Sequence, residues 1–345
     1  YANLGSMSNR GVEVELNAEL VRTKKFSWSV GVNATHYKNQ ITSIPDQKKL
    51  KAYEGHYGYE SGDYFYGEGL PMWTRYLYRS AGVDPNTGEM TYYTYAPRYD
   101  LSKPVYVQDA NGKDVVDANG NKVQQLDRWG EPVYKPLKKT EKDANGNETE
   151  VPVAVDRLTK TTQTSEAAYF LGKSSHPDLY GGFNTRLSYA GFDLGLDFSF
   201  QLGGYVIDTD YAGLLKGLSG TNGGGAVHKD VLTKSWTPTN RNAKYPRLQS
   251  GIALETNHTS SVDLFYTSAS FLSLNNVNFG YTVPKEFLHR YTKGQVKNLR
   301  LYVAADNVYY WSARKGLDPR QSLTGSGKES YSTVRTISGG LTLTF

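Results

Sequence analysis

The residue types that catalyse reactions are few in this sequence, and none stands at a spacing that enzymes use. There is no cysteine, and the six histidines are scattered along the chain. Neither His-Glu-x-x-His, the common zinc-protease pair, nor Gly-x-Ser-x-Gly, the serine-hydrolase elbow, occurs. Gly172-Lys173-Ser174 matches the end of a phosphate-binding loop, but Ala167 stands where that loop needs its first glycine. We therefore predict no enzymatic activity, no catalytic residue and no cofactor.

Three Asp-Ala-Asn-Gly segments, which begin at Asp109, Asp117 and Asp143, bring side-chain oxygens close together. The calcium loop of an EF-hand has its glycine at position 6 and a glutamate at position 12, whereas here the glycine falls at position 4. Asn-Gly is first of all a turn signal. We interpret the segments as turns, with calcium binding as the alternative, and predict no metal site.

The remaining chemistry is contact with a ligand. Aromatic side chains in predicted loops or at strand ends could stack on sugar rings, and the candidates are Trp73, Tyr76, Trp236, Tyr310 and Trp311. Charged residues between apolar ones could face the same ligand, and these are Arg186, Asp193 and Asp197, with Glu13, Glu15 and Glu19 beside them. The alternative for the charges is that they solvate an interior or pair with another part of the protein.

Strands must position these residues, because apolar and polar residues alternate through much of the chain. The segment 192–203 alternates without an exception, which is the period of a strand with one apolar face. The same pattern recurs at 12–20, 26–35, 183–189, 276–283, 299–306 and 336–345, and more weakly near 73–83 and 89–95, which makes about nine strands. Residues 285–292 are predicted to hold one short helical turn.

Strand length and loop order favour a transmembrane barrel over a soluble sandwich. Several alternating segments run 11 to 16 residues, whereas strands of soluble proteins typically have about 5–6 and membrane strands need about 9–11. The connections alternate short and long, with the long ones near 42–70, 96–179, 208–268 and 312–332. Outer-membrane barrels have short periplasmic turns and long outer loops, so we expect the long loops outside and the C-terminus in the periplasm.

Composition and aromatic placement agree with a barrel. Mean hydropathy is −0.58, a low value that fits the alternating strands of a barrel as well as it fits a soluble protein. The net charge of +5 is spread along the chain, so no nucleic-acid surface is expected. Several aromatic residues fall near strand ends, where interfacial girdles lie, namely Tyr37, Tyr205, Tyr281, Tyr309, Tyr310 and Trp311. Trp73 and Tyr76 are girdle candidates as well as ligand candidates.

The motifs of the chain resemble one family, the SusC-like TonB-dependent transporters of Bacteroidetes. The opening residues 3–14 are similar to its Asn-x-Gly-x-Met-x-Asn-x-Gly-x-Glu segment, and Tyr180-Gly181-Gly182-Phe183 is similar to its middle hairpin. Further matches, in family order, are 26–28 with 33–35, 172–177, 189–194, 236–240, 245–248, 281–284, 306–309 and 316–319. The chain departs from the family over 96–171, where a Lys-rich stretch with Asp-Ala-Asn-Gly replaces the usual acidic loop.

The resemblance implies a plugged barrel of about 22 strands, of which residues 1–345 would be the C-terminal part of the one barrel domain. It implies active import of a large nutrient across the outer membrane, an oligosaccharide first and a peptide second. It also implies a SusD-like lipoprotein, contact with TonB through an upstream segment, and the rest of the barrel, its plug and the lipid bilayer as partners. The chain begins at Tyr1 without Met, so we expect an incomplete or processed N-terminus.

The chain ends on Phe345, in phase with Leu341 and Leu343. We interpret these three residues as the signal that the barrel-assembly machinery reads, the alternative being a strand that happens to end there. A surface binding protein or adhesin without active transport is the second functional hypothesis, and a soluble glycan-active enzyme is the third.

Overall fold

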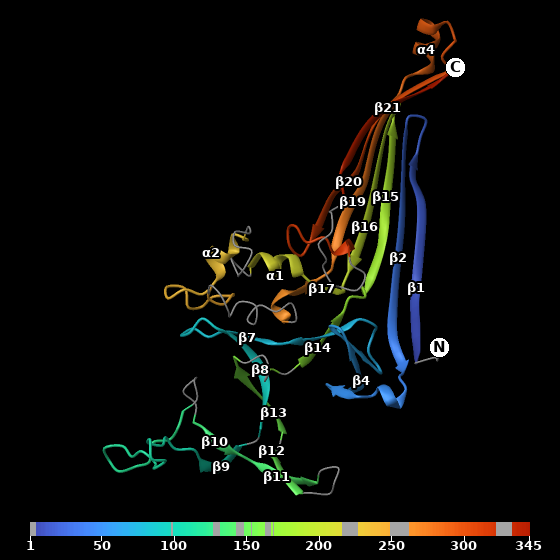
Figure 1. Cartoon of the computed structure of the whole chain (residues 1–345). Coiled ribbons are helices and arrows are strands. Elements are labelled where there is room, and N and C mark those ends of the chain that lie inside the picture. Colours follow the sequence, from blue (N-terminus) through green and yellow to red (C-terminus); the bar gives the residue numbers. More distant parts are fainter. Residues whose placement is uncertain are drawn as a thin grey trace.

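The computed structural model describes residues 5–97, 99–126, 132–142, 148–152, 154–162, 167, 169–215, 227–248, 262–321 and 333–345. Its largest unit is a sheet of seven antiparallel strands, which forms one end of an elongated molecule (Figure 1). Across the sheet, the strands are β1 (Ser6–Arg22), β2 (Phe26–Ser43), β15 (Leu179–Tyr189), β16 (Phe192–Leu202), β19 (Phe271–Thr282), β20 (Asn298–Ser312) and β21 (Thr336–Thr344).

The alternation of residues gives this main sheet one apolar and one polar face. The register places apolar residues side by side, so that Phe183 pairs with Val32 on one side and with Phe198 on the other. This apolar face is open to the surroundings, with Leu16 59% and Val303 53% exposed. A contiguous apolar surface of this kind is a contact surface for lipid or for another protein.

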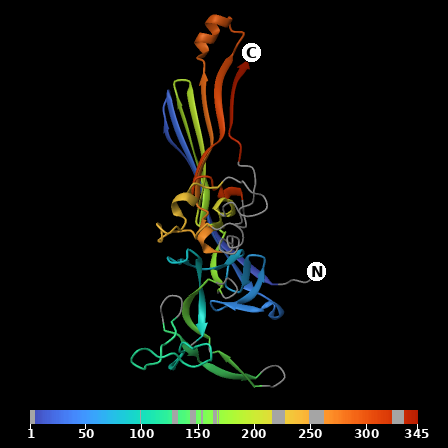
Figure 2. The same cartoon turned by 60° about the vertical axis from the view of Figure 1, so that its left-hand side comes forward.

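Short and long connections alternate, so the two ends of the main sheet differ. Residues 23–25, 190–191 and 283–297 connect strands at one end, which we call the turn end. Residues 44–178, 203–270 and 313–335 connect them at the other, the loop end, where most of the remaining structure lies (Figure 2). The connection at 283–297 contains helix α4 (Lys285–Thr292), where the sequence predicts a short helical turn.

Small sheets build the loop end. One has the order β14-β6-β5-β4-β3, a second β13-β8-β7, and three pairs are β9–β10, β11–β12 and β17–β18. Their bounds are β3 Lys51–Tyr53, β4 His56–Ser61, β5 Tyr64–Gly67, β6 Thr74–Tyr78, β7 Ser80–Val83, β8 Met90–Pro97, β9 Tyr99–Pro104, β10 Tyr134–Pro136, β11 Lys138–Lys142, β12 Glu148–Pro152, β13 Ala154–Thr161, β14 Tyr169–Ser174, β17 Tyr205–Ile207 and β18 Tyr266–Ser268. The helical turns are η1 Asp46–Lys48, α1 Thr209–Leu215, α2 Asp230–Lys234, η3 Asp263–Phe265 and η4 Pro319–Gln321.

The largest buried hydrophobic cluster lies at the loop end, around α1. It consists of Leu77, Ile207, Tyr211, Ala212, Leu215, Val231, Tyr245 and Phe265. An ion pair lies next to this cluster, in which Arg314 Nε is 2.6 Å from Asp208 Oδ2. The Arg314 guanidinium also lies over the ring of Tyr211, a member of the cluster. The loop end therefore has a core of its own, whereas the apolar face of the main sheet remains uncovered.

The two weaker alternating segments form strands outside the main sheet. Residues near 73–83 and 89–95 become β6, β7 and β8, which pair in the small sheets. The main sheet thus has seven strands in the described part of the chain, against the nine or so that alternation alone predicts. These three strands have only five, four and eight residues, fewer than a membrane strand needs. Within the described ranges, no helix is both long and apolar enough to cross a bilayer.

The first two Asp-Ala-Asn-Gly segments are turns, as the sequence predicts. Asp109 Oδ1 accepts the backbone N–H groups of Asn111 and Lys113, each at 2.9 Å. Asp117 repeats the arrangement with Asn119 and Asn121. The third copy, from Asp143, lies outside the described residues. No group of three His, Asp or Glu that could hold a metal ion occurs among the residues described.

These turns belong to a small projecting module. Backbone N–H groups of Val107, Val123 and Val115 donate in a closed ring, each to the carbonyl of the next, over 2.8–2.9 Å. The module is attached through the β9–β10 pair, in which Pro104 lies opposite Tyr134. It lies at the far end of the molecule from the turn end of the main sheet (Figure 1).

Candidate ligand-contacting face

The polar face of the main sheet carries charges that are paired across strands. Arg186 Nη2 lies 2.7 Å from Asp197 Oδ1. Arg300 donates twice to Asp193, from Nη2 over 2.5 Å and from Nε over 3.1 Å, and once to Asn278 over 2.9 Å. Partly exposed pairs of this kind contribute only about 0–1 kcal/mol to stability. Their main effect here is that Arg186, Asp197, Arg300 and Asp193 neutralise one another at the centre of the polar face.

Glycines on neighbouring strands make room for the two guanidinium groups. A Cβ on Gly195 would lie 3.1 Å from Arg186 Cδ, and a Cβ on Gly280 would lie 2.7 Å from Arg300 Cζ. Each arginine therefore lies flat across the adjacent strand. These groups, with Ser27 and Ser29, line a cavity of about 420 Å³ on the polar face.

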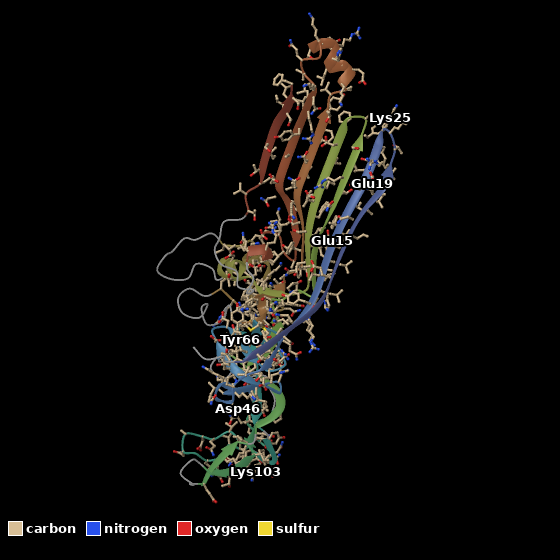
Figure 3. The ribbon with its side chains drawn as sticks, turned by 90° about the vertical axis from the view of Figure 1, so that its right-hand side faces the viewer. Glu15, Glu19, Lys25, Asp46, Tyr66 and Lys103 are labelled. Carbon is tan, nitrogen blue, oxygen red and sulfur yellow. The ribbon has the colours of Figure 1, made fainter. Side chains whose placement is uncertain are left out.

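Strand β1 adds carboxylates to the same face. Figure 3 shows Glu15 and Glu19 along β1 and Lys25 at its turn end. Glu13 lies opposite Thr35 and Glu15 opposite Asn33, whereas the apolar Leu16 lies opposite Val32. Since β1 is an edge strand of the main sheet, these carboxylates lie at the border of the polar face.

A second cavity, of about 550 Å³, lies where the polar face meets the loop end. We call it the loop-end pocket, and its principal lining residues are Tyr37, Trp73, His176, Tyr180, Gln201, Phe271 and Arg320. The Trp73 and His176 rings stack with centroids 4.9 Å apart. Tyr37 approaches Tyr180 edge-on at 6.0 Å. Aromatic surface from three separate segments thus converges on one hollow.

The loop-end pocket carries no net charge from its ionisable groups. His176 Nδ1 lies 2.7 Å from the Tyr37 hydroxyl, and its buried Nε2 has no hydrogen-bond partner in the described part of the protein. Burial lowers the pKa of His176, which favours the neutral ring. Arg320 is neutralised by two hydrogen bonds to Asp318, over 2.7 and 2.8 Å, and also donates to Ser273. The pocket is aromatic, polar and electrically neutral.

The structure distributes the predicted aromatic residues over different places. Trp73 lines the loop-end pocket with φ +55°, a left-handed conformation that is uncommon for a bulky residue. Tyr310 lies beside the pocket, under the Arg320 guanidinium at 4.7 Å. Trp311 lies on the apolar face, opposite Leu272 and 49% exposed. Only Trp73 and Tyr310 are therefore at or beside the pocket on the polar face.

The other two predicted aromatic residues lie within the loop-end structure. Tyr76 in β6 packs against Tyr169 at 4.7 Å and stacks on Tyr53 at 5.9 Å. The Trp236 indole donates to the Pro85 carbonyl over 3.0 Å. Both side chains have intramolecular partners, and a role in ligand binding stays a prediction for each.

Sequence reasoning missed several residues of the pocket. The sequence does not indicate His176, Tyr180 or Arg320 as ligand contacts, and it indicates Tyr37 only as a girdle residue. For Tyr37 the available signal is parity, because it is in phase with the polar positions Asn33 and Thr35 of the same strand. Arg300 also escaped selection although it alternates with Leu299 and Leu301, and it proves to be the partner of Asp193.

The three C-terminal candidates share the apolar face at the turn end. Leu341 lies opposite Leu301, and Leu343 lies opposite Leu299. Leu341 and Phe345 are 63% and 71% exposed. Strand β21 is the other edge of the main sheet. At an exposed edge strand, these side chains are accessible to another protein. Recognition by the barrel-assembly machinery stays a prediction.

An antiparallel sheet with long strands, one exposed apolar face, one polar face and all long loops at one end is part of a transmembrane β-barrel. Known proteins agree. The chain is 24% identical over 332 residues to one TonB-dependent receptor of Formosa agariphila, covering 95% of the chain and 29% of that receptor. It is 26% identical over 355 residues to a second, covering 99% and 29%. It is 24% identical over 343 residues to the TonB-dependent receptor SusC of Bacteroides thetaiotaomicron, covering 99% and 27%.

Solved structures show the same fold. The RagAB peptide transporter superimposes with a TM-score of 0.66 at 21% identity, over 100% of this chain and 30% of that one. The RagAB peptide importer in its closed-closed state gives a TM-score of 0.63 at 22% identity. No protein-family model matches the chain. The chain is thus similar to TonB-dependent receptors, SusC among them, over nearly its whole length, and spans about 30% of theirs.

Proposed function

We propose that this chain is the C-terminal part of a TonB-dependent importer, which carries a large nutrient across the outer membrane. The main support is that the fold of the main sheet and the alignment with known receptors agree. The main sheet has the two faces of a barrel wall, and nearly all of the chain aligns with TonB-dependent receptors. In this proposal the polar face lines the lumen, the loop end lies outside the cell and the C-terminus lies in the periplasm.

The loop-end pocket would receive the substrate first. Aromatic rings offer flat apolar surfaces to sugar rings, and hydroxyl and amide groups such as those of Tyr37 and Gln201 supply hydrogen bonds. A neutral pocket does not favour a charged ligand. We therefore place an oligosaccharide ahead of a peptide, although the RagAB relative is described as a peptide transporter.

The proposed machinery needs partners that this chain does not contain. A SusD-like lipoprotein would close over the loop end, and a plug would fill the lumen. TonB would act on that plug through an upstream segment. The unpaired edges β1 and β21 would join the remaining strands of the same barrel.

Transport can be separated from mere surface binding by dependence on energy. We would delete the full-length gene and measure uptake of labelled oligosaccharides and peptides, with and without functional TonB. The proposal predicts that uptake is lost in both the gene deletion and the TonB mutant, while surface binding survives without TonB. If binding occurs without any TonB-dependent uptake, the protein is a surface binder or adhesin.

A further inference from the structure

Helix α4 presents two aromatic side chains to the surroundings. Phe287 is 55% and Tyr291 68% exposed, whereas Leu288 is buried and holds the helix to the structure. Phe287 and Tyr291 are four residues apart, which places them on one side of a helix, and their rings contact at 4.5 Å. A short helix at the tip of a hairpin thus exposes an aromatic pair that the described structure does not cover.

Several cations lie in or near helix α4 without an ion-pair partner among the described residues. Residues 285–297 contain one carboxylate, that of Glu286, and four cations, namely Lys285, Arg290, Lys293 and Lys297. Lys24 and Lys25, in the neighbouring β1–β2 turn, lie at the same end of the main sheet; Figure 3 marks Lys25 there. None of these six cations forms an ion pair within the described residues, in contrast to Arg186, Arg300, Arg314 and Arg320. The turn end has a surplus of positive charge that is available to a partner.

The extent of the apolar face indicates where helix α4 lies relative to the hydrocarbon core of the membrane. On β20 this face runs from Trp311 to Leu299, twelve residue steps that span about 40 Å at about 3.3 Å per residue. A strand tilt of about 40° reduces this to about 30 Å, the thickness of the hydrocarbon core of a typical bilayer. Leu299 and its neighbour Leu343 therefore mark the border of the apolar face at the turn end. Helix α4 begins two residues after Val283, whose backbone N–H donates to the Leu299 carbonyl, so the helix lies just beyond that border.

We propose that α4 is an interfacial anchor, whose partner is the phospholipid headgroup layer at the turn end. Phe287 and Tyr291 would enter the boundary between headgroups and acyl chains, where aromatic side chains are favourable. The cations would lie among phosphates, with a preference for anionic lipids. The occupant is lipid because the helix lies just beyond the turn-end border of the apolar face and its positive charge complements anionic headgroups. This proposal depends on the barrel fold and is independent of what the protein transports.

The test places a fluorophore on α4 in the full-length protein. The described segment contributes no cysteine of its own, so Tyr291→Cys can be labelled with NBD once cysteines elsewhere are replaced. His289→Cys, exposed on the opposite side of the same helix, is the matched control. Both proteins are reconstituted in vesicles of phosphatidylethanolamine and phosphatidylglycerol that contain lipid with a nitroxide at acyl carbon 5. Heat-modifiable migration on a gel verifies that each variant is folded.

We expect the nitroxide to quench NBD at position 291 at least about twofold more than at position 289. A second variant, with Lys285, Arg290 and Lys293 changed to Gln, should lose the preference for nitroxide-labelled phosphatidylglycerol over phosphatidylcholine. Equal, weak quenching at 291 and 289 would overturn the proposal. So would NBD at 291 that is shielded from water but not quenched, because a protein segment would then cover the helix.

Discussion

The guanidinium of Arg300 lies across the backbone of Gly280 on the neighbouring strand and reaches Asp193 one strand further. A Cβ on Gly280 would lie only 2.7 Å from Arg300 Cζ, so the glycine is what lets Arg300 make its two hydrogen bonds to Asp193. Arg300 thus links three strands of the polar face, and it can do so because Gly280 on the middle strand has no side chain.

Replacing Gly280 with alanine should destabilise the barrel. The new methyl group would push Arg300 away from Asp193, and overpacking of this kind costs about 1–3 kcal/mol. The urea concentration at which the full-length protein loses its heat-modifiable migration measures the effect. Gly339→Ala is the matched control, because its Cβ would approach no atom closer than 3.8 Å. Equal midpoints for the two variants would contradict the role of Gly280.

The Asp208–Arg314 pair should hold the loop end together. The Asp208 side chain is 5% exposed and accepts two hydrogen bonds from Arg314, which is 27% exposed, and a hydrogen bond to a charged group contributes about 1.5–3 kcal/mol. We expect Asp208→Ala to be cleaved much faster by trypsin in the loops while the main sheet stays intact. Asp210→Ala, an exposed neighbour in α1, should be cleaved like the wild type. Identical digestion of both variants would show that the pair is dispensable.

Trp73 should contribute to ligand affinity and Trp311 should not. Loss of one aromatic stacking contact costs about 0.5–1.5 kcal/mol, which weakens Kd by up to about tenfold. Calorimetric titration of the full-length protein with its transported ligand measures this for Trp73→Ala. Trp311→Ala is the control, because that ring lies on the apolar face. The assignment of the pocket fails if the two variants bind equally well.

Acid should weaken the loop-end pocket through His176. Burial lowers the folded pKa of His176 below its ordinary value of 6.5, so the unfolded state binds the proton more tightly. The stabilising contribution is complete above about pH 6.5 and declines as the pH falls towards the folded pKa. Thermal midpoints of wild type and His176→Asn, measured between about pH 5 and 8, should converge on the acidic side. A constant difference would exclude His176 as the titrating group.

Deletion of Phe345 should sharply reduce insertion into the outer membrane. The ring ends an edge strand on the apolar face and is 71% exposed, so its loss changes recognition more than packing. The amount of heat-modifiable protein in outer-membrane fractions measures insertion. Phe345→Tyr, which keeps a terminal aromatic ring, should insert normally. Unchanged insertion of the deletion variant would refute the signal.

Alternation predicted the long strands well, because each residue of a membrane strand faces one of two different environments. Its limits are visible in β19. The sequence predicts a strand only over 276–283, whereas β19 starts at Phe271, because a bulge at Asn275 moves Leu272 and Leu274 into phase with Val277. Local patterning cannot foresee such a change of phase.

The loop-end pocket could not be predicted for a different reason. Its residues come from the strands β2, β15, β16 and β19, and from the segments before β6, before β15 and between β20 and β21. Only the tertiary arrangement brings Tyr37, Trp73, His176 and Arg320 together. The sequence indicates Trp73 only as an aromatic residue of a predicted loop or girdle, and nothing in the sequence links it to His176.

The hairpin module on β9 and β10 has a consequence for how such proteins diversify. Pro104 and Tyr134 lie opposite each other at its base, so the chain leaves and re-enters the rest of the loop end at one point. Material between these two residues can be exchanged, shortened or expanded with little disturbance of the wall. The tip of the loop end can thus vary in sequence and length without changing the strands of the main sheet.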